Sequence, residues 1–163
     1  MHHAIGLANR NQENPWPLAP HERWRFDTSD FPTMGYFDLI TPIFEDYAQR
    51  DAGIDIHSIN VLIVLKDGDL PEALERLRSL EREISTRPIT WREFLGTCHP
   101  PHGAPVIRIE PLLFRARALS LIGKLRLLIQ FAISDHFVIV YGNGVLYQHL
   151  LGNALPPGTE EYS

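Results

Sequence analysis

The C-terminal third of the chain, residues 105–151, constrains the fold most, because apolar runs alternate there with turn residues. The run 136–141 is rich in β-branched and aromatic residues, and it lies between turn residues at 134–135 and 142–144. Short polar and glycine-rich segments of this kind favour tight turns between antiparallel strands. With residues 145–150 as a last strand, this region predicts an antiparallel β-meander.

The segment 114–133 can be tested against a helical and a two-residue period. As one helix, it splits its charges between opposite sides and leaves no continuous apolar stripe. As two strands joined by a turn at Gly123-Lys124, it has one face without any charge. We therefore expect a hairpin whose opposite face presents Arg115, Arg117 and Arg126.

Three other regions show clear hydrophobic patterns. Apolar residues recur at helical spacing over 37–50 and again over 70–84, which predicts two amphipathic helices. Residues 59–65 form a nearly continuous apolar run, which is typical of a strand buried on both faces. The run 105–110 predicts one more strand, ended or bent by Pro111.

Two pairs of residues have the spacing of a capping box, the motif that closes a helix N-terminus with side-chain hydrogen bonds. Asp69 and Glu72 stand at the start of the second amphipathic helix. Thr90 and Glu93 repeat the pattern, which predicts a short helix over 91–95.

Together these elements predict an α+β fold, with helices packed on one face of a mostly antiparallel sheet that ends in a C-terminal β-meander. A chain of 163 residues is expected to form a single domain, here residues 23–155. We interpret the proline-punctuated residues 1–22 as an N-terminal arm that wraps the surface or stays mobile. Residues 156–163 are interpreted as a C-terminal tail.

The compartment is predicted from cysteine usage and from the N-terminus. The lone Cys98 excludes an intrachain disulfide, which fits a reducing compartment. The first residues lack the cationic start and apolar core of a secretory signal. Four charges within 114–133 argue against a membrane span there. We expect a cytoplasmic protein that does not bind membranes.

Charge is unevenly distributed along the chain. Residues 38–84 hold 11 acidic and 5 basic side chains, a net of −6, whereas residues 85–152 hold 3 acidic and 7 basic, a net of +4. The net charge of −5 for the whole chain argues against nonspecific binding to nucleic acid. The acidic region favours a basic protein partner. Its candidate contact residues are Asp38, Glu45, Asp46, Asp67, Asp69, Glu72 and Glu75.

The basic residues of the predicted sheet allow two interpretations. In the first, the acidic helix over 70–84 packs near them and the charges balance within the protein. In the second, they form a site for an anionic ligand or acidic partner, because guanidinium groups match carboxylates and phosphates. The residues of that candidate site are Arg115, Arg117, Arg126 and His149.

Potential metal ligands cluster only at Cys98, His99 and His102, which offer a thiolate and two imidazoles. A fourth ligand would have to come from His2, His3, His21 or His57. Because no second cysteine exists and the paired spacing of zinc sites is absent, we interpret this stretch as an exposed loop. A catalytic role for Cys98 is disfavoured as well, because a thiolate after a helix C-terminus opposes the helix dipole.

No other chemical motif is specific. Asp135 and His136 are adjacent, but neighbouring side chains of a strand point to opposite faces and cannot relay a proton. Residues 66–69 carry acids where a phosphate-binding loop needs backbone amides and lysine. We therefore expect no cofactor and no catalytic residue.

Two classes of function follow from this survey. The first is a small non-enzymatic protein that binds a protein partner, such as an immunity-type protein that neutralises a bacterial toxin. The second is a small-ligand-binding or enzymatic domain with a cavity between helices and sheet, lined by arginine, histidine and tyrosine. We favour the first, because no catalytic constellation is specific. The tyrosines considered for such a cavity are Tyr36, Tyr47, Tyr141 and Tyr147.

Overall fold

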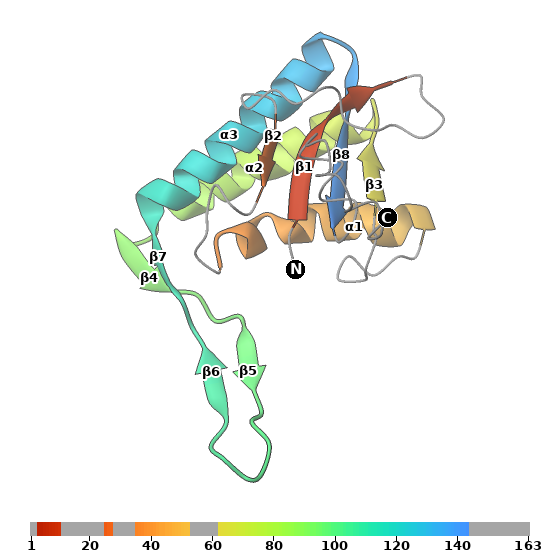
Figure 1. The fold of residues 1–163 in the computed structure, drawn as a ribbon. Coiled ribbons are helices and arrows are strands. Elements are labelled where there is room, and N and C mark those ends of the chain that lie inside the picture. Colours follow the sequence, from red (N-terminus) through yellow and green to blue (C-terminus); the bar gives the residue numbers. More distant parts are fainter. Residues whose placement is uncertain (1–2, 11–24, 28–34, 53–61, 144–163) are drawn as a thin grey trace, which may run out of the picture.

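The computed structural model describes residues 3–10, 25–27, 35–52 and 62–143. These residues form a body, which comprises a four-stranded sheet and three α-helices, and an arm, residues 89–114, which extends away from it (Figure 1). In chain order the elements are β1 (His3–Asn9), β2 (Arg25–Asp27), the 3-10 helix η2 (Phe37–Leu39), α1 (Thr41–Ala52), β3 (Leu62–Leu65), α2 (Asp69–Ser85), β4 (Thr90–Arg92), β5 (Gly96–Cys98), β6 (Ile107–Ile109), β7 (Leu112–Phe114), α3 (Arg115–Ser134) and β8 (Phe137–Asn143).

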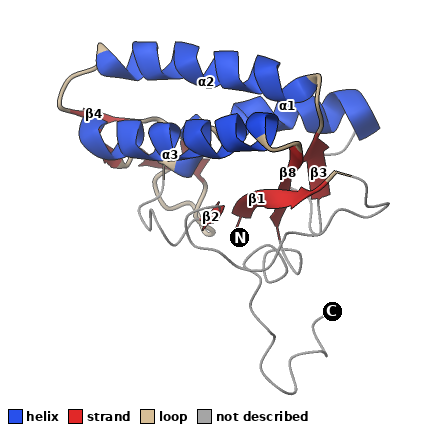
Figure 2. Cartoon of the chain, turned by 90° about the horizontal axis from the view of Figure 1, so that it is seen from above, coloured by secondary structure: helices blue, strands red, loops and turns tan. Residues whose placement is uncertain are grey.

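The sheet of the body has the strand order β2-β1-β8-β3, and every neighbouring pair is antiparallel. The three helices lie together on one side of this sheet (Figure 2). The α+β class predicted from the sequence, with helices on one face of an antiparallel sheet, is therefore confirmed. The order also places β3 at an edge and β8, the last described strand, in the interior of the sheet.

The core is built on the helix-facing side of the sheet. Ile5 of β1 and Ile63 of β3 flank Tyr141 of β8 in register, and the next inward row repeats the arrangement around Ile139. Cross-strand neighbours of this kind are the unit of sheet stabilisation, because their side chains touch on one face. All of these residues are buried in the same cluster as the inner faces of the helices.

The helix predicted over 37–50 is observed as η2 followed by α1. Pro42 lies in the first turn of α1, where its missing N–H has no helical partner to lose. Phe44 of α1 stacks on Tyr141 with ring centroids 5.0 Å apart, which anchors the helix on the sheet. The Tyr47 hydroxyl donates to the carbonyl oxygen of Asp69 at 3.2 Å and so joins α1 to the start of α2.

Helix α2 confirms the helix predicted over 70–84. Its apolar stripe is buried, and Leu80, which is partly buried, packs against the same core. The capping box predicted at Asp69 and Glu72 is wrong, because the helix begins at Asp69 and its N-cap, Gly68, makes no side-chain bond. The Asp69 carboxylate instead accepts the N–H of Lys66, three residues upstream, at 3.2 Å.

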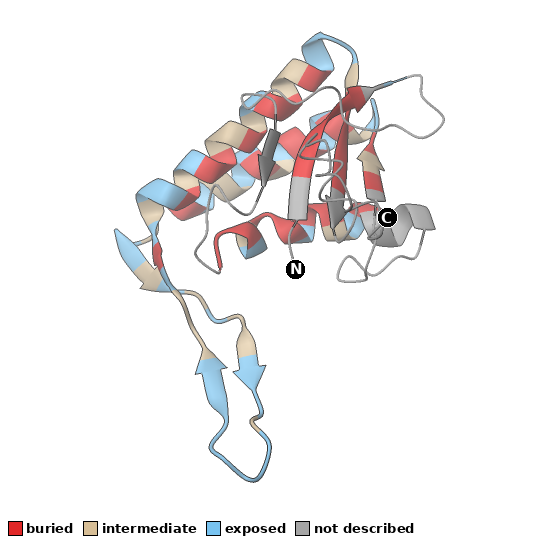
Figure 3. Cartoon of the chain, in the orientation of Figure 1, coloured by how far each residue is buried: buried red, intermediate tan, exposed pale blue. Residues whose placement is uncertain are grey.

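The hairpin predicted over 114–133 is wrong, because this segment belongs to the single 20-residue helix α3. Its buried side chains recur at intervals of one, three and four residues, which is the stripe of an amphipathic helix. Figure 3 shows this buried stripe along the helix. Its members are Ala118, Leu121, Ile122, Leu125, Leu128, Ile129 and Ala132.

The error has two causes. The charges of α3 lie on two sides of the helix but still leave the buried apolar stripe between them, and a two-residue period also finds a face without charge. Gly123 was the expected turn, but it lies inside the helix, where a Cβ would meet nothing within 4 Å. Packing against α2 and β8 decides the conformation, because the stripe of α2 needs a helical neighbour to cover it. The β-meander is therefore reduced to one described strand, β8, and the expected strand over 145–150 lies outside the described residues.

The N-terminal residues contradict a second expectation. Residues 3–9 do not wrap the surface, because they form β1, which pairs with β8 along seven residues. Ile5 and Leu7 are buried in the core. The turn predicted at 142–144 is also wrong for Gly142 and Asn143, which continue β8 and pair with β1. The rest of the predicted division, into an N-terminal segment 1–22, a domain 23–155 and a C-terminal tail 156–163, stays a prediction.

The remaining strand predictions fall in two places. The strand predicted over 59–65 is confirmed for Leu62–Leu65, whereas 59–61 lie outside the described residues. The strand predicted over 105–110 is confirmed for Ile107–Ile109, but it belongs to the arm instead of the main sheet. None of the helices in the described ranges combines the length and apolarity that a membrane crossing requires.

Candidate functional site

The arm is a two-stranded antiparallel ribbon that leaves the body between α2 and α3 (Figure 1). β4 pairs with β7 near the body, and β5 pairs with β6 farther out. Three residues, 93–95, lie between the paired Arg92 and Gly96, but only two, 110–111, lie opposite them. The first strand therefore contains a β-bulge, which increases the twist of the ribbon there.

The helix predicted over 91–95 is wrong, because Thr90–Arg92 form β4. The side chain of Glu93 does not close a capping box: its Oε2 accepts the indole N–H of Trp91 at 2.6 Å. The same oxygen accepts a guanidinium N–H of Arg87 at 3.3 Å. The Glu93 carboxylate thus binds Trp91, two residues earlier in β4, and Arg87, just after α2, instead of the helix N-terminus that its spacing suggested.

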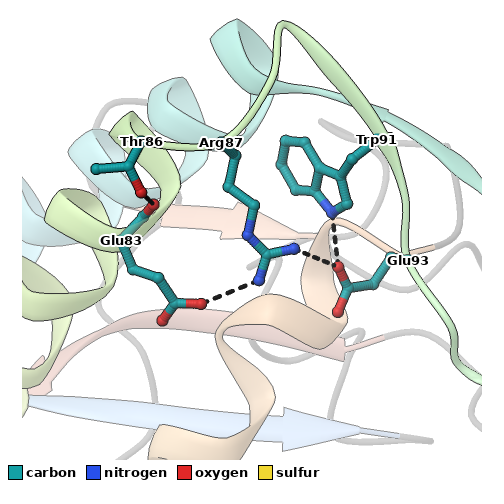
Figure 4. Close-up of polar contacts among 5 residues, drawn as sticks. All are labelled: Glu83, Thr86, Arg87, Trp91 and Glu93. Atoms are coloured by element: carbon teal, nitrogen blue, oxygen red, sulfur yellow. Dashed lines mark hydrogen bonds and ion pairs between the residues drawn. The ribbon is translucent and has the colours of Figure 1, made fainter.

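A polar cluster fixes the base of the arm to the end of α2 (Figure 4). Arg87 donates to Glu83 at 3.0 Å and to Glu93 at 3.3 Å, and its guanidinium carbon lies 5.1 Å from the centre of the Trp91 ring. The Thr86 hydroxyl donates to the Glu83 carbonyl at 2.7 Å. Because Arg87 contacts both α2 and the arm, it holds the arm's first strand in a defined direction.

The second strand of the arm is fixed by η2 and the residues just before it. The N–H of Phe114 donates to the hydroxyl of Tyr36, a buried side chain, at 2.8 Å. Gly35 has a φ of +105°, and a Cβ there would lie 2.9 Å from Cγ of Pro111 and 3.0 Å from a methyl group of Leu113. A glycine is required at this close approach, which seats the base of the arm against the body.

Exposed apolar side chains are concentrated on the arm. Among the described residues eight large apolar side chains are exposed, and all but Leu127 and Ile133 lie within 89–114. Figure 3 shows the contrast between the exposed arm and the buried interior of the body. The six arm residues are Ile89, Phe94, Val106, Ile107, Leu112 and Phe114. Such a concentration of exposed apolar side chains on a protruding element indicates an interaction surface.

Charged groups accompany these apolar residues. Arg108 lies over the Phe94 ring, 4.4 Å from its centre, and donates to the Glu110 carboxylate at 2.8 Å. Arg92 donates to the carbonyl oxygen of Glu110 at 3.0 Å. Because strand residues alternate between faces, Val106, Arg108, Glu110 and Leu112 share one face of the ribbon.

The loop predicted for Cys98, His99 and His102 begins one residue later than expected, because Cys98 is the last residue of β5 and pairs with Ile107. His99 and His102 follow at the far end of the arm, and all three side chains are exposed. His102 and Gly103 have φ values of 65° and 73°, so the chain reverses through left-handed conformations there. Within the described ranges, no three histidine, cysteine or acidic side chains gather closely enough to hold a metal ion.

The acidic residues predicted to bind a partner lie on η2, on α1, on α2 and in the turn before α2. Three of them already pair with arginines: Asp46 with Arg76 at 2.7 Å, Glu75 with Arg78 at 3.6 Å, and Asp67 with Arg10. Asp69 accepts a main-chain N–H, and Glu45 is half-buried. The remaining two, Asp38 and Glu72, are exposed. These pairs reduce the surplus of negative charge that was expected to attract a basic partner.

The arginines predicted to form an anion site do not converge. Arg115 donates to the Arg87 carbonyl at 2.9 Å, Arg117 lies 5.8 Å from the Phe114 ring centre, and Arg126 pairs with Glu81 at 3.3 Å. Arg126 lies eleven residues along α3 from Arg115, and its Nε is buried against Glu81. For Arg126, therefore, the first interpretation applies: its positive charge is balanced within the protein by an acidic side chain of α2. His149 lies outside the described residues.

The tyrosines considered for a cavity are core residues where they are described. Tyr36, Tyr47 and Tyr141 are buried, and Tyr147 lies outside the described ranges. Burial raises the pKa of Tyr141 above its usual value of 10.0, and the nearby Asp38 carboxylate adds to the shift. The phenol of Tyr141 is thus held neutral between Phe37 and Phe44. His136 sits in a turn, with a φ of 60° and its Nδ1 3.4 Å from Arg10.

The sequence reasoning missed the arm as a unit. A signal was present, because residues 107–110 alternate β-branched and charged side chains and the segment 90–98 contains Thr90, Trp91 and Thr97, which favour strands. The two stretches flank a proline-rich loop at 100–105, as the strands of a hairpin would.

Comparisons with known protein families, with curated proteins and with solved structures gave no match to this chain.

Proposed function

We propose that this chain is a non-enzymatic binding protein that contacts a protein partner through its arm, residues 89–114. The observation that supports the proposal is the concentration of six exposed large apolar side chains on this one ribbon. An isolated two-stranded ribbon is marginally stable in water, so a partner that covers it would add the missing packing. The firm attachment of its base to α2 and η2 keeps the ribbon extended toward such a partner.

The acidic residues of η2, α1, α2 and the turn before α2 offer a second surface, suited to a basic partner. Asp46, Asp67 and Glu75 are already paired, so this surface supports the proposal less than the arm does. Neutralisation of a bacterial toxin, a basic partner and a cytoplasmic location stay predictions from the sequence.

The proposal is tested by photo-crosslinking in cells of the source organism. A photoreactive phenylalanine analogue is placed at Phe94 or at Leu112 on the arm, and for comparison at Glu75 on α2 or at Leu127, which is exposed on α3. We expect the two arm positions to give the same covalent product, and the α2 and α3 positions to give none. A product from Glu75 alone would overturn the arm as the contact surface and favour the acidic one.

A further inference from the structure

The free edge of β6 has a defined pattern of main-chain groups. Among the described residues β6 pairs with β5 on one side only. The carbonyl of Ile109 accepts the N–H of Leu95 at 2.9 Å, and that of Pro111 accepts the N–H of Glu93 at 3.1 Å. Residues of an antiparallel strand alternate in the side to which their main-chain groups point. The main-chain groups of Arg108 and Glu110 therefore point outward, away from β5.

Among the described residues, the body contacts this outer edge at the base of the arm. There the outward N–H of Phe114 donates to the Tyr36 hydroxyl. Farther out, the positions of Leu112, Glu110 and Arg108 have no neighbouring strand in the described part of the chain. Pro111 does not interrupt the edge, because its missing N–H falls on the inward side. The Glu110 carbonyl already accepts Arg92, but it has a second lone pair.

We propose that this edge pairs with the same edge of a second copy of the chain, antiparallel across a twofold axis at Ile109. The two arms then form one four-stranded ribbon. This inference rests on the proposed function, because it names the partner of the arm. A twofold contact between identical strands is self-complementary, and strand addition of this kind satisfies the exposed main-chain groups.

The charges of the strand select this register. With the axis at Ile109, Arg108 lies opposite Glu110 of the second copy, and the reciprocal pair forms on the other side of the axis. An axis at Arg108 or at Glu110 would instead place two like charges directly opposite each other, which is unfavourable. The arm itself contains two arginines, Arg92 and Arg108, and two glutamates, Glu93 and Glu110, so its net charge is zero. Two arms therefore approach without the repulsion expected between two whole chains of net charge −5.

The apolar residues fit the same register. Val106 lies opposite Leu112 of the second copy, and Ile107 lies opposite its Pro111. Val106, Ile107 and Leu112 are exposed in the single chain, with 52%, 56% and 38% of their surface accessible. The pairing thus brings exposed apolar side chains together on both faces of the new ribbon, which removes them from water.

The first experiment uses charge reversal in the full chain, with self-association measured by sedimentation equilibrium. The variants R108E and E110R each replace two attractive cross-strand pairs by two repulsive ones, so we expect each to weaken the dimer about tenfold. Both variants also break the ion pair between Arg108 and Glu110 within each chain. A mixture of the two variants separates these effects. In the mixed dimer every cross-strand pair is again opposite in charge, whereas each chain still lacks its own pair. We expect the mixture to associate as tightly as the unmodified chain.

The second experiment reports the position of the axis. In a C98S background, I109C places two thiols opposite each other at a Cα separation of about 4.5 Å, within the range of a disulfide. We expect a disulfide-linked dimer on oxidation. The matched variant I107C in the same background places its two thiols on opposite sides of the axis, so it should form little disulfide-linked dimer. Circular dichroism of both variants confirms that the body has folded.

Three results would overturn the inference: a chain that is monomeric at all concentrations, a dimer that R108E and E110R leave unchanged, or equal crosslinking of I109C and I107C. The proposed function fails separately. A monomeric chain whose Phe94 and Leu112 positions crosslink to a different protein would refute the second copy as partner and retain the arm as binding surface. Absence of any product from the arm would refute both.

Discussion

In the described part of the chain, β8 of the body has a strand on either side and helices over one face, whereas β6 of the arm has a strand on one side only. Both strands are rich in β-branched residues, yet Ile139 of β8 is fully buried and Ile107 of β6 is more than half exposed. The difference shows that strand-forming sequence does not by itself produce a core. A core forms where another layer covers the strands, and none of the described residues forms such a layer over the arm.

The largest expected effect tests whether the body alone holds the stability. Leu121→Ala removes a fully buried side chain of α3, and we expect it to lower the free energy of unfolding by about 2–5 kcal/mol. Ile107→Ala in the arm should cost less than about 1 kcal/mol in the single chain, because the side chain is already exposed. Denaturant unfolding at low protein concentration measures both.

Leu127→Ala is a control on the same helix. Leu127 is 61% exposed, so we expect a change within about 0.5 kcal/mol. In the hairpin predicted from the sequence, Leu127 would face the core and Leu121 would not. A large loss from Leu127→Ala together with a small one from Leu121→Ala would therefore contradict helix α3.

The second prediction concerns the junction of arm and body. Gly35→Ala places a Cβ 2.9 Å from Cγ of Pro111, at a φ of +105° that alanine rarely adopts. We expect a loss of about 1–3 kcal/mol in the free energy of unfolding, measured by denaturant unfolding. The matched variant Gly103→Ala shares a positive φ but meets nothing within 4 Å, so its loss should be smaller. Equal losses would show that the contact with Pro111 contributes nothing.

The third prediction concerns the pH dependence of the body. Burial keeps Tyr141 neutral in the folded protein, so its pKa there lies above the value of 10.0 that it has when unfolded. Above that pH only the unfolded state ionises, and stability falls by about 1.4 kcal/mol per pH unit from this one group. Urea unfolding between neutral and alkaline pH measures the slope, which should be shallower in Tyr141→Phe. An unchanged slope in that variant would contradict the shift.

The smallest losses in the free energy of unfolding are expected when two ion pairs, one in the body and one in the arm, are broken. Arg126→Gln leaves the buried carboxylate oxygen of Glu81 without its cation, and we expect a loss of about 1–2 kcal/mol. Arg108→Gln breaks an exposed pair in the arm, which should cost at most about 1 kcal/mol in the monomer. A double-mutant cycle with Glu81→Gln isolates the coupling, and a value near zero would show that the Arg126 pair is no better than a surface pair.

Much of the body could be predicted because its signals are local. The stripe of α2 and the apolar runs of β3 and β8 each show their period within a few residues. Helix α3 could not be assigned this way, since its many leucines satisfy two periods and only its contact with α2 and β8 excludes one of them. Strand β1 pairs with a strand that lies 128 to 140 positions later in the chain (137 − 9 and 143 − 3), so no local pattern reports the pairing.

The arm could be predicted only in part, for a related reason. The strand over 105–110 has a β pattern of its own. The spacing of Thr90 and Glu93 fits a helix cap, and nothing local shows that the Glu93 carboxylate instead binds Arg87 at the end of α2. The side to which each main-chain group of β6 points follows from its hydrogen bonds to the first strand of the arm. The bulge sets the register of those bonds, and the sequence alone does not show where the bulge lies.

The pairing of β1 with β8 has a consequence for synthesis on the ribosome. Ile5 and Tyr141 are neighbours in the finished sheet, although 136 positions of sequence separate them. The nascent chain therefore cannot complete its central ladder until almost all of the described residues have emerged. Such a high contact order implies slow folding. Until then the apolar side chains of β1 cannot pack against β8, and unpaired apolar segments of this kind are targets for chaperones.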